Sequence, residues 1–155
     1  MKVEYIYHSG FTIETDKYFL VFDYYMGDIE IKDKKTIVFA THKHQDHFNP
    51  IIFDWQKDNP DIVYVLSSDI EIDSGKNIYK INPYKELEID NIEIKSFGST
   101  DLGVSFLIKL DGKYIFHSGD LNWWHWEDKP VEDQLKEERD FKAEIAKIDK
   151  INLDI

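Results

Sequence analysis

The sequence predicts a mixed α/β protein that is built mainly from short strands. Apolar and polar residues alternate near the N-terminus, which is the pattern of strands with one buried face. Two nearly continuous apolar runs, Thr36–Thr41 and Ile62–Leu66, have the pattern of strands buried on both faces. A helix start lies between these runs, and a strand–helix–strand order implies a parallel pair with a right-handed crossover. These three patterns place the chain in the α/β class.

The first half of the chain is predicted to be a meander that leads into this parallel unit. Gly10 and the pair Asp16-Lys17 mark turns between the first strands. Asn49 and Pro50 have the N-cap and first-turn preferences of a helix, which we expect to end near Gln56. The strands predicted here are Val3–Tyr7, Phe11–Glu14, Tyr18–Asp23, Thr36–Thr41 and Ile62–Leu66.

The second half is predicted to contain five more strands and one long helix. Asp111-Gly112 is a strong two-residue hairpin signal. After Pro130 a highly charged helix is expected from about Val131 to Asp149, and Ile151–Ile155 alternates like the start of another strand. The apolar helix positions with helical spacing are Phe141, Ile145 and Ile148. The strands predicted here are Ile78–Ile81, Leu87–Ile89, Ile92–Ser96, Val104–Leu110 and Lys113–His117.

Length and composition indicate one folded domain, residues 1–155. Hydrophobic residues make up 42% of the chain, which excludes a disordered protein. The chain has no cysteine, so disulfides, thiolate nucleophiles and zinc–thiolate sites are excluded. No apolar run approaches the roughly 18 residues that cross a bilayer, and Met1–His8 does not resemble a signal peptide. We therefore predict a cytoplasmic protein with no membrane partner.

The charge balance bears on the partners of the protein. Acidic residues number 31 against 19 basic ones, which gives a net charge of −12. Such a field repels phosphate backbones, so nucleic acid is disfavoured and a small-molecule substrate is favoured.

The chemistry is concentrated in Thr41–His47, which follows a predicted buried strand. His42 and His44 lie two residues apart and point the same way if the strand continues to them, and the loop beyond can turn Asp46 and His47 into the same space. Imidazole and carboxylate ligands without thiolate suit zinc, manganese or iron. This cluster predicts a metal site.

The heptapeptide THKHQDH at 41–47 matches the HxHxDH signature of the metallo-β-lactamase superfamily. Asp23, at a strand end, resembles the family's early aspartate that braces the histidine loop. Asp120, in HSGD, resembles the aspartate that bridges two metals. The opening segment Tyr7–Phe11 is similar to the branch that includes L-ascorbate-6-phosphate lactonase.

The resemblance implies a fold, a metal centre and an activity. The fold would be an αββα sandwich of two β-sheet-plus-helix halves, of which this chain holds the N-terminal half and the start of the second. His42 and His44 would bind one metal, Asp46 and His47 a second, and Asp120 would bridge them. Zinc is the expected cofactor, as one or two ions, with manganese or iron as alternatives. The implied enzyme is a hydrolase that attacks a small ester, lactone or phosphorylated metabolite with a metal-activated water, and Asp46 and Asp120 would be its catalytic carboxylates.

The chain departs from the family pattern at two ligands. The family histidine that usually lies 15–25 residues before the bridging aspartate is absent, and Asp101 is either its substitute or an ordinary turn residue. The last family histidine belongs to the second half, which we expect to begin at Ile151–Ile155. An uncovered sheet face would then favour a homo-oligomer. The alternative function is a catalytically inactive metal-binding remnant or half-domain that acts by association.

Three further histidines remain to be placed. His8, in the first hairpin loop, either reaches the metal site or is a turn residue. His117 is expected to pack within its strand. His125, among the indoles of Trp123, Trp124 and Trp126, is either a substitute metal ligand or a residue that lines the substrate pocket, unless that loop simply caps the core.

Overall fold

In the computed structural model the chain consists of two compact units, Met1–Ile81 and Asn82–Ile155. The structure describes residues 1–73, 75–149 and 151–155. Each unit has its own sheet, and each is described here by itself.

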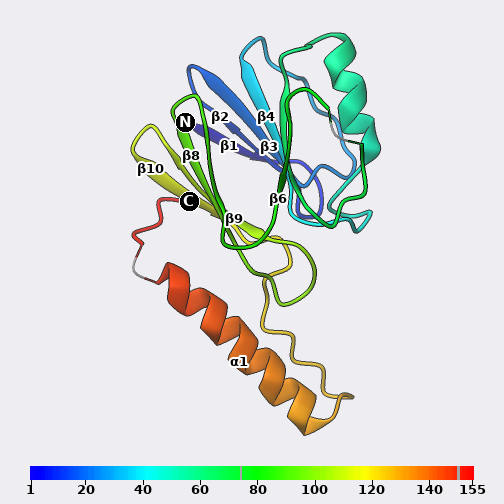
Figure 1. The fold of residues 1–155 in the computed structure, drawn as a ribbon, viewed down its shortest axis with the longest axis vertical. Coiled ribbons are helices and arrows are strands. Elements are labelled where there is room, and N and C mark those ends of the chain that lie inside the picture. The colour runs from blue at the N-terminus through cyan, green and yellow to red at the C-terminus, as the bar shows by residue number, and fades with distance from the viewer. Residues whose placement is uncertain (74, 150) are drawn as a thin grey trace. The chain divides into compact units, whose positions relative to one another are not determined.

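The first unit holds a six-stranded sheet in the order β1-β2-β3-β4-β5-β6 (Figure 1). The pairs β1–β2 and β2–β3 are antiparallel, while β3–β4, β4–β5 and β5–β6 are parallel. The predicted meander and the predicted parallel pair are therefore both present. The strands are β1 (Lys2–Tyr5), β2 (Phe11–Glu14), β3 (Tyr18–Phe22), β4 (Lys35–Ala40), β5 (Val63–Ser67) and β6 (Ile78–Ile81).

The core of this unit lies on the central strands. Every residue of β3 and β5 is buried, and so is β4 after its first residue. The continuous apolar runs predicted this burial for β4 and β5. Tyr64 is buried on β5, and its hydroxyl donates a 2.8 Å hydrogen bond to the carbonyl of Ile52. Burial raises the pKa of Tyr64 far above its usual range, so this hydroxyl stays protonated and keeps its role as a donor.

The connection between β4 and β5 is helical, as predicted. It is a 3-10 helix, η1 (Pro50–Lys57). Asn49 caps it as predicted, because its side chain accepts from the amide of Ile51 at 3.0 Å, and Pro50 occupies the first turn.

The second unit holds an antiparallel four-stranded sheet in the order β10-β9-β8-β7. Asp111 and Gly112 both have positive φ, 51° and 77°, which is the requirement of the tight hairpin that their sequence predicts between β9 and β10. The strands are β7 (Glu86–Ile89), β8 (Ile92–Phe97), β9 (Ser105–Leu110) and β10 (Lys113–His117).

The predicted charged helix is α1 (Val131–Ile148), coloured orange to red in Figure 1. Its C-terminal half is tied to the loops of the same unit through Glu144. One carboxylate oxygen of Glu144 accepts from the amide of Gly98 at 3.1 Å, and the other accepts from the hydroxyl of Tyr84. A side chain at position 98 would lie 2.9 Å from this carboxyl group, so glycine permits the close approach. Of the three predicted apolar positions, Ile148 is buried and Phe141 and Ile145 are half-buried.

The segment 151–155 is not a strand, contrary to the prediction for Ile151–Ile155. It nevertheless runs along β10 in an extended form. The amide of Asp154 donates to the carbonyl of Tyr114 at 2.8 Å, and the amide of Phe116 donates to the carbonyl of Ile155 at 2.9 Å. These bonds are too few to make a regular ladder. Within the described parts of the chain, no helix combines the length and the apolar character needed to cross a membrane.

Candidate metal centre

The histidine loop, residues 41–47, begins where β4 ends and is anchored to Asp23 just beyond β3. Because β3 and β4 are parallel neighbours, their carboxyl ends lie at the same edge of the sheet. Asp23 Oδ1 accepts from the amide of Thr41 and Asp23 Oδ2 accepts from its hydroxyl, both at 2.8 Å. A third bond of 2.8 Å joins Asp23 Oδ2 to His47 Nδ1. One fully buried carboxylate thus holds both ends of the loop.

These bonds fix the tautomer of His47. An ionised carboxylate can only accept hydrogen bonds, so Nδ1 of His47 carries the proton. The other ring nitrogen, Nε2, then has the lone pair in the neutral imidazole and is the atom that can bind a metal. Histidines that bind a metal through one ring nitrogen usually donate the N–H of the other nitrogen to a carboxylate, a carbonyl or a water, as His47 does here.

Thr41 fixes the tautomer of His42 in the same way. The threonine hydroxyl has a single proton, which it donates to Asp23, so towards His42 Nδ1 at 3.1 Å it can only accept. His42 Nδ1 is therefore protonated as well, and Nε2 is left as the metal-binding atom. Thr41 had no role in the sequence prediction, although its position between a buried strand and HxHxDH was visible.

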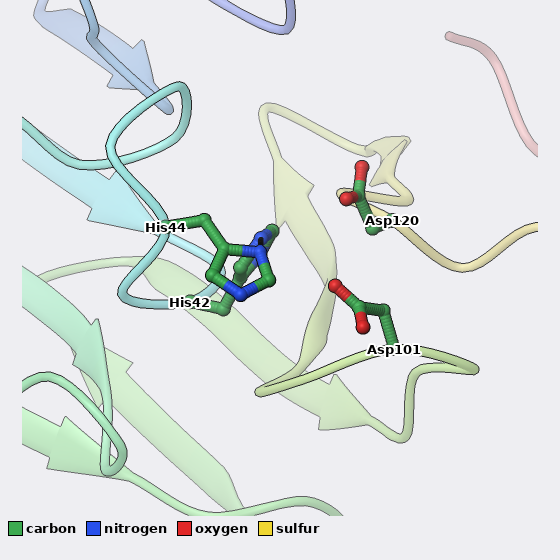
Figure 2. A group of neighbouring side chains, drawn as sticks. All are labelled: His42, His44, Asp101 and Asp120. Atoms are coloured by element: carbon green, nitrogen blue, oxygen red, sulfur yellow. Dashed lines mark hydrogen bonds between the residues drawn. The ribbon is translucent and has the colours of Figure 1, made fainter.

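His42 and His44 face each other, as Figure 2 shows. His42 Nε2 and His44 Nδ1 lie 3.1 Å apart, with the two rings nearly perpendicular. His42 is completely buried, whereas His44 is exposed. The two imidazoles thus bring one nitrogen each to a common point at the end of β4.

A second group in the same unit contains His8, Asp46 and His47. His8 Nε2 lies 3.0 Å from Asp46 Oδ2, and His47 Nε2 lies 4.0 Å from the same oxygen. One ligand atom from each of the three residues lies within 4.8 Å of the others. The structure therefore brings His8 close to the histidine loop.

In the second unit, Asp101 and Asp120 bring two carboxylates together. Asp101 lies between β8 and β9, and Asp120 follows β10 (Figure 2). A ligand oxygen of each lies within 4.8 Å of the other. The hydroxyl of Thr100 joins the two loops, since it donates to the carbonyl of Asn122 at 2.6 Å and accepts from the amide of Asn122 at 2.9 Å. Asp101 therefore lies beside Asp120 in this unit.

The two remaining histidines are placed differently. His117 is the last residue of β10 and pairs with Phe106. His125 is exposed in the loop beyond β10 and, in the described residues, belongs to neither potential metal group. Around it, Trp123 and Trp126 are 41% and 49% exposed, whereas Trp124 is half-buried.

Tyr24 directly follows Asp23 in the chain. Tyr24 packs edge-on against Trp55, and its carbonyl accepts from the amide of Asn49 just after the histidine loop. Burial, and then the charge of Asp28, raise the pKa of Tyr24. Its hydroxyl therefore stays protonated and donates to the carbonyl of Gly27 at 2.8 Å.

The sequence model of the beta-lactamase superfamily domain matches residues 2–134. This chain belongs to the beta-lactamase superfamily. Two curated relatives are metal-dependent hydrolases of the UPF0173 family. The one from Nanoarchaeum equitans is 30% identical over 122 residues, covering 77% of this chain and 49% of the relative. The one from Pelotomaculum thermopropionicum is 28% identical, covering 77% of this chain and 62% of the relative. The chain thus spans about half to three-fifths of the length of these relatives.

Solved structures show the same fold. Igni18, a metallo hydrolase from Ignicoccus hospitalis, aligns with a TM-score of 0.57 at 18% identity, over 76% of this chain and 59% of that one. BJP-1, a subclass B3 metallo-β-lactamase of Bradyrhizobium japonicum, aligns with a TM-score of 0.52 at 14% identity, over 94% of this chain and 69% of that one. The diiron β-hydroxylase CmlA of Streptomyces venezuelae aligns with a TM-score of 0.53 at 12% identity, over 77% of this chain and 29% of that one. The predicted metallo-β-lactamase fold class is confirmed.

Proposed function

We propose that this chain carries the metal centre of a hydrolase that acts on a small ester, a lactone or a phosphorylated metabolite. The observation that carries the proposal is the buried network from Asp23 through Thr41 to the loop histidines. It fixes His42 and His47 with Nε2 unprotonated, which is the form that binds a metal. A structural role alone would not require two imidazoles to be held in the same tautomer.

The donor set fits a first-row divalent cation. We assign His42 and His44 to one ion and Asp46 and His47 to a second, with Asp120 as the bridging carboxylate by resemblance to the family. Nitrogen and oxygen ligands without thiolate suit zinc, and also manganese or iron. A cation held there would lower the pKa of a bound water and would polarise a carbonyl or phosphoryl oxygen.

The chain's own residues prepare this chemistry in two ways. Asp23 and Thr41 hold the imidazoles in the ligand tautomer before any ion arrives. Asp46 and, by resemblance to the family, Asp120 would supply negative charge that offsets the charge of the cations. The net charge of −12 disfavours nucleic acid, which supports a small substrate. The similarity of Tyr7–Phe11 to the lactonase-like branch makes a lactone our first choice of substrate.

The test is a hydrolysis assay with and without added metal. The purified chain, loaded with zinc, manganese or iron(II), is assayed against aryl esters, lactones and phosphate monoesters. The Asp120→Asn variant should lose about a hundredfold or more in turnover of any responsive substrate, because several kcal/mol of transition-state stabilisation depend on correctly held metal. Asp111→Asn, which changes an exposed hairpin aspartate, serves as the control and should keep full activity. Unchanged kinetics in Asp120→Asn would assign the activity to another site.

A further inference from the structure

We propose that His8 is a metal ligand, and that it completes with Asp46 and His47 a three-residue cation site contained within residues 1–81. The HxHxDH signature includes Asp46 and His47 but not His8, which comes from the loop between β1 and β2. The inference rests on the proposed metal centre and adds to it a residue that the family signature does not contain.

The distances fit one ion among the three side chains. At zinc–ligand distances of about 2.0–2.2 Å, two ligands of a tetrahedral ion lie roughly 3.3–3.6 Å apart. Asp46 Oδ2 lies 3.0 Å from His8 Nε2 and 4.0 Å from His47 Nε2, on either side of that spacing. Shifts of about half an ångström in exposed side chains would admit the ion, and the side chains of His8 and Asp46 are 49% and 47% exposed.

The backbone holds His8 in position. Ile6 donates to the carbonyl of Gly10 at 2.9 Å, and Gly10 donates to the carbonyl of Tyr7 at 2.8 Å, which closes a tight turn around His8. His8 has a φ of 53°, a left-handed conformation that non-glycine residues seldom adopt. The turn therefore points the His8 imidazole towards the histidine loop. Its ring lies edge-on to the ring of His47, with 5.7 Å between the ring centroids.

The three ligands also have complementary chemistry. His47 is fixed by Asp23 and presents Nε2, so it needs no rearrangement to bind. Asp46 would supply the anionic oxygen, and His8 would supply an exposed imidazole that binds through Nε2. Two imidazoles and one carboxylate form the ligand set of catalytic zinc sites and of non-haem iron(II) sites. Such a set leaves coordination positions open for water or substrate.

The rival role for His8 is a hydrogen bond to Asp46 without metal contact. His8→Asn separates the two roles, because asparagine tolerates positive φ and can still donate to a carboxylate but is a poor ligand for zinc. The matched control is His125→Asn, which removes an exposed imidazole outside both potential metal groups. The probes are Zn²⁺ by titration calorimetry and Co²⁺ by its visible spectrum, with the full chain.

We expect His8→Asn to weaken one binding event by about tenfold to a hundredfold or more, and His125→Asn to bind as the wild type does. His42→Ala with His44→Ala should retain an ion that depends on His8. If the wild type binds ions and His8→Asn binds them with unchanged affinity, His8 is not a ligand and the proposed metal centre still stands. If the wild type binds neither Zn²⁺ nor Co²⁺, the proposed function itself fails.

A second measurement needs no substitution. Diethyl pyrocarbonate modifies exposed imidazoles, and peptide mass spectrometry locates the modified residue. Zn²⁺ should slow modification of His8 several-fold and leave the rate at His125 unchanged. Equal rates at His8 with and without Zn²⁺, in protein that calorimetry shows to be loaded, would overturn the proposal even if His8→Asn fails to fold.

Discussion

Asp23 and His47 form a completely buried pair, in which Asp23 Oδ2 lies 2.8 Å from His47 Nδ1. The aspartate follows β3 and the histidine lies in the loop after β4, so the pair joins the ends of two parallel neighbours. Because the same carboxylate also accepts twice from Thr41, three donors depend on one residue. This pair connects the stability of the sheet edge to the tautomers of the loop histidines.

Asp23→Asn should therefore lower both stability and metal affinity. The amide can accept fewer of the three hydrogen bonds, and a buried donor left unsatisfied costs about 1–3 kcal/mol. Asparagine tolerates the φ of 42° at this position, so the loss reports on hydrogen bonding rather than backbone strain. Urea unfolding and zinc titration measure the two effects. Asp111→Asn is the matched control, since Asp111 also has positive φ but lies in an exposed hairpin turn. Equal stability of the two variants would contradict the role given to Asp23.

Thr41→Val tests whether the Thr41 hydroxyl, which donates to Asp23, fixes the tautomer of His42. Valine keeps the shape of threonine but cannot hold His42 Nδ1, so metal affinity should fall about tenfold to a hundredfold. The control is Thr36→Val, which removes another buried hydroxyl, one that donates to the carbonyl of Lys34 at 3.2 Å, far from any histidine. Calorimetric zinc titration should show a loss for Thr41→Val alone. Similar affinities in both variants would remove Thr41 from the site.

Gly10→Ala should displace the loop that carries His8. An added Cβ would lie 2.9 Å from the carbonyl oxygen of Tyr7 and 3.3 Å from that of Asp23, and backbone atoms cannot move aside easily. Overpacking of this kind costs about 1–3 kcal/mol. Gly75→Ala is the control, because its nearest contact is the flexible end of Ile78 at 3.0 Å. Thermal melts should give a lower melting temperature for Gly10→Ala than for Gly75→Ala. Equal melting temperatures would show that the turn accommodates an added Cβ.

Glu144→Ala should release the C-terminal half of α1. The substitution leaves the amide of Gly98 without its carboxylate acceptor and removes the bond from Tyr84. Amide hydrogen exchange over residues 141–148 should become faster, while Glu138→Ala, which removes only a surface pair with Lys142, should leave exchange there unchanged. Unaltered protection in Glu144→Ala would mean that apolar contacts alone hold the helix.

The sequence predicted what depends on local pattern. The strands of both sheets were located to within one or two residues, because continuous apolar runs and the Asp111-Gly112 turn are local signals. The type of η1 was missed, since Asn49 and Pro50 favour the start of either an α- or a 3-10 helix. Ile151–Ile155 alternates like a strand but makes only scattered bonds to β10.

The sequence predicted which residues belong to the candidate site but not the hydrogen bonds that join them. HxHxDH marked the candidate ligands, whereas the tautomers of His42 and His47 follow from three hydrogen-bond distances that no spacing encodes. His8 meets Asp46 only because the first hairpin folds back to the sheet edge. Cytoplasmic location and self-association stay predictions.

Metal binding by the histidine loop can be measured as the metal content of the purified chain. After loading with zinc or manganese and removal of free ions, elemental analysis should find bound metal in the wild type. The double variant His42→Ala with His44→Ala should lose the ion that these two imidazoles hold, while circular dichroism confirms that its sheets remain. Equal metal content in the two proteins would contradict the account.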